Sequence, residues 1–371
     1  MIPRSKAIRL CIVSALAAAL VAVGLGGYAL TQFTPVGKVI SIIRLLDQTY
    51  YQDFDHAEIL EGAARGVVAA LGDPYTVYMT QEEWYEFYIR TSGEYSGIGV
   101  TITEKDGGVC IVSPMKGTPA EAAGLQVNDF ILKVDGKPVS SGDEAAALIR
   151  GPAGTEVVLT IYRDGDTFDV TIVREDITIP AVDYSMMDDG IGYIELITFN
   201  ERSALAMTEA MLALDSQGAK AIILDLRYNG GGLLDRCIDI ARLFVPEGTV
   251  VTIKGKSFEE TTYVSQGPGI DKPLFVLVNG GTASASEILA GAIQDYQVGT
   301  LIGTTTFGKG LVQNSFKLKD GSVVKVTIAE YFTPSGRSIN GVGIEPDIIV
   351  EGDDAQLAKA VELARAAISD T

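Results

Sequence analysis

Hydrophobic residues recur at helical spacing in the segment that follows residue 36. They fall three or four positions apart, which is typical of amphipathic helices that bury one face. The first group is Val39, Ile42, Ile43 and Leu46, and the second is Ile59, Leu60, Ala63, Val67 and Leu71. The pattern predicts two helices that end at the turn Gly72-Asp73-Pro74, with His56 in a polar capping role at the start of the second.

Beyond residue 93 the pattern changes to short β-branched runs separated by glycine turns, such as G-I-G-V-T-I-T and F-D-V-T-I-V-R. Such runs are typical of strands in a small β-rich unit. Helical spacing survives only over Pro119–Ala123 and Glu144–Ile149. We therefore expect residues 93–176 to form a separate domain of strands with two short helices.

From residue 177 onward, strands and helices alternate. The strands in A-K-A-I-I-L-D-L-R and P-L-F-V-L-V-N are continuously apolar, and helices are predicted over Ser203–Leu214, Leu234–Phe244 and Asp354–Ile368. Apolar strands between helices imply a sheet that is covered on both faces. The expected fold is multidomain α/β, with a helical region over residues 31–92 and an α/β core over residues 177–371.

The first thirty residues differ from the rest of the chain. Three basic residues, Arg4, Lys6 and Arg9, precede an uncharged run over residues 10–30. At about 1.5 Å per residue this run is long enough to cross a bilayer. The apolar region of a cleaved signal peptide is usually shorter, about 7 to 15 residues, so the length favours a retained anchor over a signal that is removed.

The basic residues before the run place the amino terminus in the cytoplasm and the chain from Thr31 outside. We therefore expect a single-pass protein of the cell membrane with an extracytoplasmic body, and secretion after cleavage is the alternative.

Cys110 and Cys237 are too few and too far apart to indicate a disulfide framework, so we expect buried thiols. The net charge of −19 argues against a nucleic acid partner, because phosphate binding needs clustered lysine and arginine.

Ser284 lies where a buried strand and a glycine turn become a helix, in the segment N-G-G-T-A-S-A-S-E. A helix amino terminus presents unpaired N–H groups that can stabilise an oxyanion beside it. The alternative is structural: Thr282, Ser284 or Ser286 caps the helix, and Glu287 completes a capping box. Taken by itself, the segment favours the cap.

Two further glycine-rich segments carry candidate chemistry. In L-D-L-R-Y-N-G-G-G-L-L, residues 224–234, successive glycines can bring backbone amides close to a substrate carbonyl. This loop lacks the lysine and hydroxyl pattern of a phosphate-binding loop. In G-T-T-T-F-G-K-G-L-V-Q, Lys309 lies between two glycines and four positions before Gln313. Taken alone, such a lysine is typical of an exposed turn.

The chain's only histidine, His56, lies far upstream of Ser284. A serine hydroxyl is a weak nucleophile until a base takes its proton, and imidazole is the commonest base. If Ser284 is a nucleophile, a lysine amine has to serve instead. A free lysine has a pKa near about 10.4, so burial would have to hold the amine neutral near pH 7.

These three segments, in this order, resemble the carboxyl-terminal processing proteases, also called tail-specific proteases, over residues 36 to about 350. The resemblance implies a protease core of the crotonase-like (ββα spiral) type that needs no cofactor and no metal. It also implies a nucleophile, a general base and a glutamine that orients the base, which are Ser284, Lys309 and Gln313. The backbone amides of Gly231 and Ala285 would form the oxyanion hole.

Two segments of the β-rich domain, S-G-I-G-V (96–100) and P-A-E-A-A-G-L-Q-V-N-D-F-I-L-K-V-D-G (119–136), resemble a PDZ domain with a β-sandwich-like fold. Such a domain adds a peptide as a strand to a sheet edge. The resemblance implies that a loop of Gly97, Ile98 and Gly99 receives the terminal carboxylate, although S-G-I-G by itself could be a simple turn. Arg150 and Arg163 are candidates for contacts through which this domain inhibits or activates the protease core.

The expected function is a membrane-anchored extracytoplasmic serine endopeptidase that recognises C-terminal tails and cleaves through an acyl-enzyme. Its expected partners are proteins or peptides with accessible C-termini, and amphipathic helices at both ends of the body suit a homodimer. One alternative is a PDZ-type scaffold whose protease half is structural. Another is an acyl-coenzyme A enzyme on a related spiral fold.

Overall fold

The computed structural model describes residues 35–256 and 259–369. The membrane segment predicted over residues 1–30 lies outside the described residues. Within the described ranges, no helix combines the length and the apolar character that a membrane span requires. The chain divides into two compact units, of which the first holds the residues up to Thr80 together with Ser315–Val326 and the second holds the remainder.

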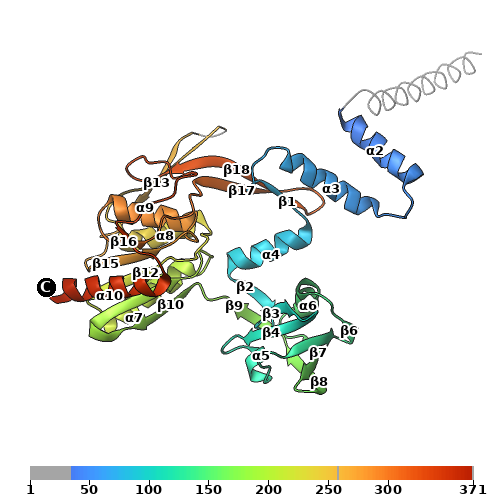
Figure 1. Cartoon of the computed structure of the whole chain (residues 1–371), viewed down its shortest axis with the longest axis horizontal. Coiled ribbons are helices and arrows are strands. Elements are labelled where there is room, and N and C mark those ends of the chain that lie inside the picture. The colour runs from blue at the N-terminus through green and yellow to red at the C-terminus, as the bar shows by residue number, and fades with distance from the viewer. Residues whose placement is uncertain (1–34, 257–258, 370–371) are drawn as a thin grey trace, which may run out of the picture. The chain divides into compact units, whose positions relative to one another are not determined.

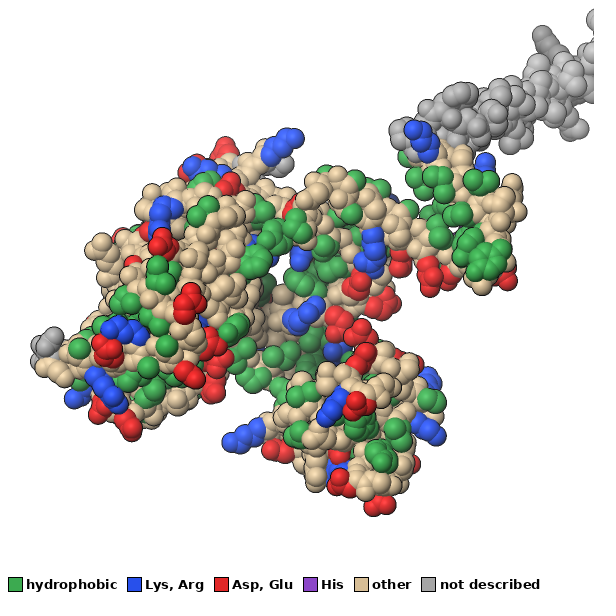
Figure 2. Space-filling model, in the orientation of Figure 1, with side chains coloured by type: hydrophobic (Ala, Val, Ile, Leu, Met, Phe, Trp, Pro, Cys, Tyr) green, Lys and Arg blue, Asp and Glu red, His purple; other side chains and the backbone are tan. Residues whose placement is uncertain are grey.

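The first unit contains the two predicted helices, α2 (Pro35–Thr49) and α3 (His56–Ala69), and a short strand, β1 (Val77–Met79). The strand pairs antiparallel with Val323–Lys325 of β18 (Val323–Phe332). Both helices expose apolar side chains, and Figure 2 shows hydrophobic side chains on this segment. The exposed set is Val36, Val39, Ile42, Leu45, Leu60 and Val67.

The capping role expected for His56 is wrong. Asp55 occupies the N-cap position of α3, and its carboxylate accepts the N–H of Ala57 at 2.7 Å. A carboxylate is the better acceptor at this position. His56 is the first helical residue, and its Nε2 lies 2.8 Å from a carboxylate oxygen of Asp47.

The second unit begins with helix α4 (Gln81–Ser92), which the sequence pattern did not predict. The β-rich domain follows, and its strands and two short helices are confirmed. A two-stranded sheet pairs β2 (Glu94–Gly97) with β9 (Glu175–Thr178). The remaining strands form a six-stranded sheet: β3 (Val100–Lys105), β4 (Gly108–Pro114), β5 (Phe130–Val134), β6 (Lys137–Pro138), β7 (Glu156–Arg163) and β8 (Asp166–Val173).

This domain has its own apolar core, formed by buried residues from its strands and helices that include Val109, Ile131, Ala145, Leu159 and Ile161. Helices α5 (Pro119–Ala122) and α6 (Gly142–Ile149) pack against the strands. Cys110 and Cys237 are both buried and free, as the sequence predicts.

The α/β core is built on a second six-stranded sheet with the order β10-β11-β12-β15-β16-β19. All neighbouring strands are parallel except β10 and β11, which are antiparallel. The strands are β10 (Val182–Met186), β11 (Ile191–Leu196), β12 (Ala221–Asp225), β15 (Leu274–Val278), β16 (Thr300–Gly303) and β19 (Ile348–Ile349). Strands β12 and β15 are buried along their whole length.

Helices cover both faces of this sheet (Figure 1), which confirms the sequence prediction. Alternate residues of β12 point to opposite faces. Leu224 packs in the cluster of α7 (Ser203–Ser216), α8 (Leu234–Phe244) and α9 (Ala285–Asp295). Ile223 packs in the smaller cluster formed with α10 (Asp353–Ser369), the red helix that ends at the C-terminus in Figure 1.

A further antiparallel hairpin, β13 (Gly248–Gly255) with β14 (Thr261–Ser265), was not predicted from the sequence. Within the second unit, β13 also pairs with Ala329–Phe332 at the end of β18. Strand β17 (Leu311–Lys317) pairs with β18 as well. These strands fix the position of Tyr331, whose hydroxyl reaches the candidate site.

Candidate active site

Ser284 lies in the turn between β15 and α9, directly before the helix. It is half-buried, and its backbone has φ +58° and ψ −117°. A residue that only caps a helix usually has extended backbone, whereas a non-glycine residue at positive φ is strained and persists where its surroundings hold it. A sharp strand-to-helix turn of this kind presents the nucleophilic serine in α/β-hydrolases.

Glu287 connects this turn to the lysine segment. Its side chain is fully buried, and its Oε2 accepts the N–H of Ser284 at 2.8 Å and the N–H of Lys309 at 2.9 Å. Its Oε1 accepts the N–H of Gly308 at 2.7 Å and the hydroxyl of Thr306 at 2.6 Å. The sequence predicted Glu287 only as part of a capping box. The structure shows that the same carboxylate brings Ser284 and Lys309 together.

Tyr331 makes a second connection between the same two residues. Its side chain is buried, and its hydroxyl donates to the carbonyl of Ser284 at 3.0 Å and to the carbonyl of Lys309. One hydroxyl hydrogen shared by two acceptors forms a three-centre bond. The sequence analysis missed Tyr331. Its only signal is that a tyrosine within an apolar strand needs a hydrogen-bond partner for its hydroxyl.

Lys309 is half-buried and lies just before β17. The glycines on either side of it are required by close backbone contacts. A Cβ at Gly308, which has φ +88°, would lie 3.0 Å from the amide nitrogen of Gly343, and a Cβ at Gly310 would lie 2.6 Å from that of Asn340. Lys309 is therefore carried by a turn that packs tightly against another loop, and this is not the exposed turn that the isolated segment suggested.

Gln313 lies on β17, two positions after Leu311. Its Nε2 donates to the carbonyl of Leu311 at 3.2 Å and lies 3.5 Å from the hydroxyl of Thr327. Gln313 lies four positions after Lys309, which precedes the first residue of the strand. The orienting role of Gln313 stays a prediction.

The two predicted oxyanion donors lie next to each other. A Cβ at Gly231 would lie 2.8 Å from the amide nitrogen of Ala285 and 2.7 Å from the carbonyl oxygen of Ala283. The φ of Gly231 is +95°, which favours glycine. Only a residue without a side chain therefore allows the loop after β12 to approach the turn that holds Ser284.

Asn229, which sequence reasoning missed, joins the two loops. Its backbone carbonyl accepts the N–H of Ala283 at 3.0 Å and the hydroxyl of Ser286 at 2.9 Å. Its side-chain oxygen accepts the N–H of Gly231 at 2.9 Å, and its amide nitrogen donates to the carbonyl of Leu196 at 2.5 Å. One of the two predicted oxyanion donors therefore already has a partner within its own loop.

Cys237, on α8, lies beneath the turn, and its thiol donates to the carbonyl of Ala285 at 3.1 Å. Burial raises the pKa of this thiol, which keeps it protonated as a donor. Cys237 therefore supports the backbone beside Ser284 and does not compete with it as a nucleophile.

In the β-rich domain, Gly97 ends β2, and Ile98 and Gly99 connect it to β3. Ile98 is only 1% exposed, so its side chain belongs to the core and the loop offers backbone groups to a ligand. A narrow pocket of about 80 Å³ lies beside this loop, lined by residues from β3 and α6. Its lining includes Ile98, Gly99, Val100, Ile102, Ala146 and Ile149.

The two arginines of this domain differ in their surroundings. Arg150 contacts Glu86 of α4, and its guanidinium lies 5.6 Å from the centre of the Tyr95 ring at the pocket. Arg163 donates to both carboxylate oxygens of Asp129, at 2.6 Å and 2.7 Å. Both arginines are therefore ion-paired, but only Arg150 lines the pocket, so it is the better placed of the two for a role there.

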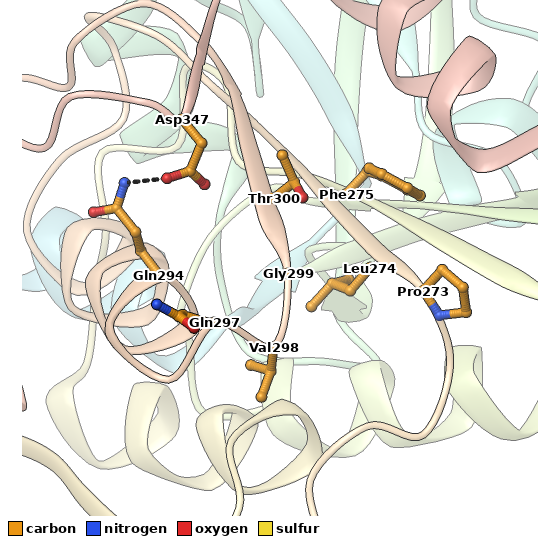
Figure 3. A pocket seen from close by; sticks show the side chains of 9 residues that line it. All are labelled: Pro273, Leu274, Phe275, Gln294, Gln297, Val298, Gly299, Thr300 and Asp347. Atoms are coloured by element: carbon orange, nitrogen blue, oxygen red, sulfur yellow. Dashed lines mark hydrogen bonds between the residues drawn. The ribbon is translucent and has the colours of Figure 1, made fainter. Parts of the chain in front are cut away.

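A separate pocket of about 380 Å³ lies on the α/β core (Figure 3). It is lined by Leu274 and Phe275 at the start of β15 and by Gln294 at the end of α9, so it is at the ends of these elements opposite to Ser284. Its one carboxylate, Asp347, already accepts from Gln294 at 2.9 Å and from the N–H of Leu301 at 2.8 Å. No serine, cysteine or lysine lines this pocket. Within the described ranges no group of three or more His, Cys, Asp or Glu side chains could hold a metal ion.

The strained Ser284 lies before a core helix, and hydrogen bonds made by its backbone and by that of Lys309 meet at the side chains of Glu287 and Tyr331. This arrangement is suited to acyl transfer by a serine peptidase. Comparison with known proteins agrees with this class. Residues 190–350 match the model of peptidase family S41, residues 111–163 match a PDZ domain, and residues 28–83 match the activating protease CtpB N-terminal domain. The chain belongs to peptidase family S41 and, within it, to the C-terminal processing proteases.

Similar proteins support this assignment. The chain is 42% identical over 310 residues to the carboxy-terminal processing protease CtpA of Bacillus subtilis, covering 82% of this chain and 66% of that protein. It is 41% identical over 308 residues to the carboxy-terminal-processing protease of Bartonella bacilliformis, covering 80% of this chain and 70% of that protein. The chain thus spans about two thirds of the length of these curated relatives.

Among solved structures, the photosystem II D1 C-terminal processing protease is 32% identical with a TM-score of 0.52, over 85% of this chain and 88% of that one. The predicted multidomain α/β fold, with a helical amino-terminal domain, a PDZ domain and a peptidase core, is therefore confirmed.

Proposed function

We propose that this chain is a serine endopeptidase that recognises the C-terminal tail of a protein through its PDZ domain and cleaves the chain through an acyl-enzyme. The observation that carries the proposal is the position of Ser284 and Lys309, whose backbones share the carboxylate of Glu287. A scaffold protein would have no need to hold a serine in a strained conformation beside a lysine. The domains we assign are residues 31–92, 93–176 and 177–371.

In the proposed mechanism, the hydroxyl of Ser284 attacks the scissile carbonyl while the neutral amine of Lys309 takes its proton. The N–H groups of Gly231 and Ala285 stabilise the oxyanion of the tetrahedral intermediate. The protonated amine then donates to the departing amine, which leaves the acyl group on Ser284. A water molecule, deprotonated by Lys309, then attacks the acyl carbonyl, and the protonated amine returns the proton to the Ser284 oxygen as the carboxylic acid product leaves. Gln313 orients the lysine.

The bond between the Gly231 N–H and Asn229 bears on how the oxyanion hole forms. Before it can donate to an oxyanion, this N–H has to break its hydrogen bond to the Asn229 side chain or form a three-centre bond to both acceptors. A conformational step of this kind would allow substrate capture to control assembly of the site. It is compatible with a PDZ domain that either inhibits or activates the core.

The peptide tail would add as a strand beside β3, in the pocket between this strand and α6. The backbone of Gly97, Ile98 and Gly99 would receive its terminal carboxylate. The positive charge of Arg150 at the same pocket favours a carboxylate there. Proteins and peptides with accessible C-termini are therefore the proposed substrates.

For location, we propose that residues 1–30 anchor the protein in the cell membrane with the peptidase outside the cytoplasm, on the basis of the basic residues that precede the apolar run. Secretion after cleavage is the alternative. The apolar side chains that α2 and α3 expose support a homodimer. Fractionation of cells that produce the full chain, with and without protease added outside, tests the location.

The proposed activity is tested with an internally quenched peptide and with unstructured casein. The full chain should cleave both, and Ser284→Ala should abolish cleavage. Ser216→Ala, at the exposed end of α7, is the matched control and should cleave normally. Cleavage that persists in Ser284→Ala, or an inactive full chain, would contradict the proposal and favour a scaffold or another acyl-transfer substrate.

A further inference from the structure

We propose that Tyr331 is a positioning residue for the Ser284–Lys309 pair, an inference that rests on the proposed function. Its hydroxyl donates to both the Ser284 carbonyl and the Lys309 carbonyl. Tyr331 would not touch the reacting atoms. It would act by fixing the backbone from which the serine and the lysine project.

Glu287 and Tyr331 hold complementary groups of the same two residues. Glu287 accepts both N–H groups, and the Tyr331 hydroxyl donates to both carbonyls. Each of the two residues is therefore held at its amide and at its carbonyl. Together these hydrogen bonds restrict both the position and the rotation of each backbone. The hydrogen bonds of the N–H groups alone would leave more freedom to rotate.

The position of the hydroxyl is itself set by the sheet. Tyr331 is 1% exposed, it pairs with Ile253 of β13, and its own N–H donates to the carbonyl of Gly310 at 3.0 Å. The backbone of Tyr331 is thus bound one residue beyond Lys309, and its side chain reaches back to Lys309 and Ser284. A displacement of the lysine turn relative to the serine would break several of these bonds at once.

The strained conformation of Ser284 gives the Tyr331 bond its importance. A backbone at φ +58° persists only where the surroundings over-determine it, because such conformations cost about 1–3 kcal/mol. The Ser284 carbonyl also accepts the N–H groups of Glu287 and Ile288, but bonds of this kind form at the start of any helix. The bond from Tyr331 is the one that ties this carbonyl to the lysine segment.

Loss of this bond should therefore affect the chemical step more than substrate binding. A displacement of about 1 Å between reacting groups can lower a rate by about a hundredfold. The tail-binding pocket lies in the PDZ domain and does not include Tyr331, so the affinity for a tail should be retained. The expected signature is a fall in kcat without a matching rise in KM.

The test compares Tyr331→Phe with Tyr193→Phe in the full chain. The control removes one hydroxyl on the other face of the core sheet, where Tyr193 packs in the cluster formed with α10 and donates to Asp225 at 2.8 Å. With a quenched peptide, Tyr331→Phe should lower kcat about tenfold or more and leave KM within about twofold. Tyr193→Phe should leave both values near those of the wild type.

Several results would overturn the inference: full kcat in Tyr331→Phe, an equal loss in both variants, or a rise in KM with kcat unchanged. A Tyr331→Phe protein that fails to fold would also count against it, because the hydroxyl would then support the fold and not the pair. If the wild type and Ser284→Ala are equally inactive, the proposed function itself fails. If the wild type cleaves and Tyr331→Phe cleaves equally well, only the inference fails.

Discussion

Ser284 and Lys309 donate their backbone N–H groups to the same carboxylate oxygen, Oε2 of Glu287, at 2.8 Å and 2.9 Å. This geometry places the two backbones side by side although a helix and a strand separate them in the chain. A lysine can serve as the base for a serine only if its amine stays close to the hydroxyl. The shared carboxylate holds the backbones of both residues at fixed positions relative to each other.

Glu287→Gln should damage both the site and the fold. The amide keeps one oxygen but replaces the other with an NH₂ group, which would face two donors in place of an acceptor. Because these donors are buried, we expect a loss of about 3 kcal/mol in the free energy of unfolding. Peptidase activity should fall more than about tenfold, measured at a temperature at which the variant is folded.

The control for this change is Glu362→Gln, on the exposed surface of α10, which should unfold and cleave as the wild type does. A Glu287→Gln enzyme with normal activity would show that the shared carboxylate does not hold the pair.

Lys309→Arg should abolish activity and leave the fold intact. Arginine keeps the positive charge and the length of the side chain, but it does not lose its proton in proteins and cannot act as a base. Circular dichroism would check the fold, and peptide hydrolysis would check the activity. Lys319→Arg, which changes an exposed turn residue, should have no effect. Substantial hydrolysis by Lys309→Arg would exclude lysine as the base.

The wild-type rate should also rise with pH in the neutral range, because only the neutral amine can accept the serine proton. Single-turnover rates of acylation across pH 5–9 would measure this. A rate that is flat or falls over this range would contradict a lysine base.

The elements with a clear repeat were predictable from the sequence. The apolar spacing of Leu234–Phe244 gave the bounds of α8, and continuous apolar runs gave β12 and β15. The helix α4 was missed because most of its residues are exposed or only partly buried, and the hairpin of β13 and β14 was missed although β13 is rich in β-branched residues. The pairing of β13 with the end of β18 could not be known, because it joins segments that lie far apart in the chain.

The components of the candidate site were predictable, but the bonds between them were not. Ser284, Lys309 and Gly231 are marked by their glycine-rich surroundings. Glu287 could be assigned only a local capping bond, because its contact with Lys309 depends on how the segments after β16 return to α9. Asn229 and Tyr331 have no local motif, and their roles arise from tertiary contacts.

Gly231→Ala should remove activity through steric conflict. The new Cβ would lie 2.7 Å from the carbonyl oxygen of Ala283 and 2.8 Å from the amide of Ala285, and residue 231 has φ +95°. The loop would have to move away from Ser284, so we expect kcat to fall by about a hundredfold or more, as it does when an oxyanion donor is lost. Stability should fall by about 1–3 kcal/mol.

The neighbouring residue provides a matched control. A Cβ at Gly230 meets nothing within 4 Å, so Gly230→Ala should retain nearly full activity and stability. Peptide hydrolysis and urea unfolding of both variants would check the pair of predictions. Equal activity in the two variants would remove Gly231 from the oxyanion hole.

Ala146→Leu should block the proposed tail-binding pocket. Ala146 lines a space of only about 80 Å³ between β3 and α6, so a leucine side chain would fill much of it. We expect the affinity for a labelled peptide with a free C-terminus to fall more than about tenfold. Fluorescence anisotropy in the Ser284→Ala background would measure binding without cleavage.

Ala147→Leu, which adds the same side chain at an exposed position of α6, should bind as the parent does. If both variants bind equally well, the tail enters elsewhere, and recognition by this domain would have to use a surface other than the groove beside Gly97, Ile98 and Gly99.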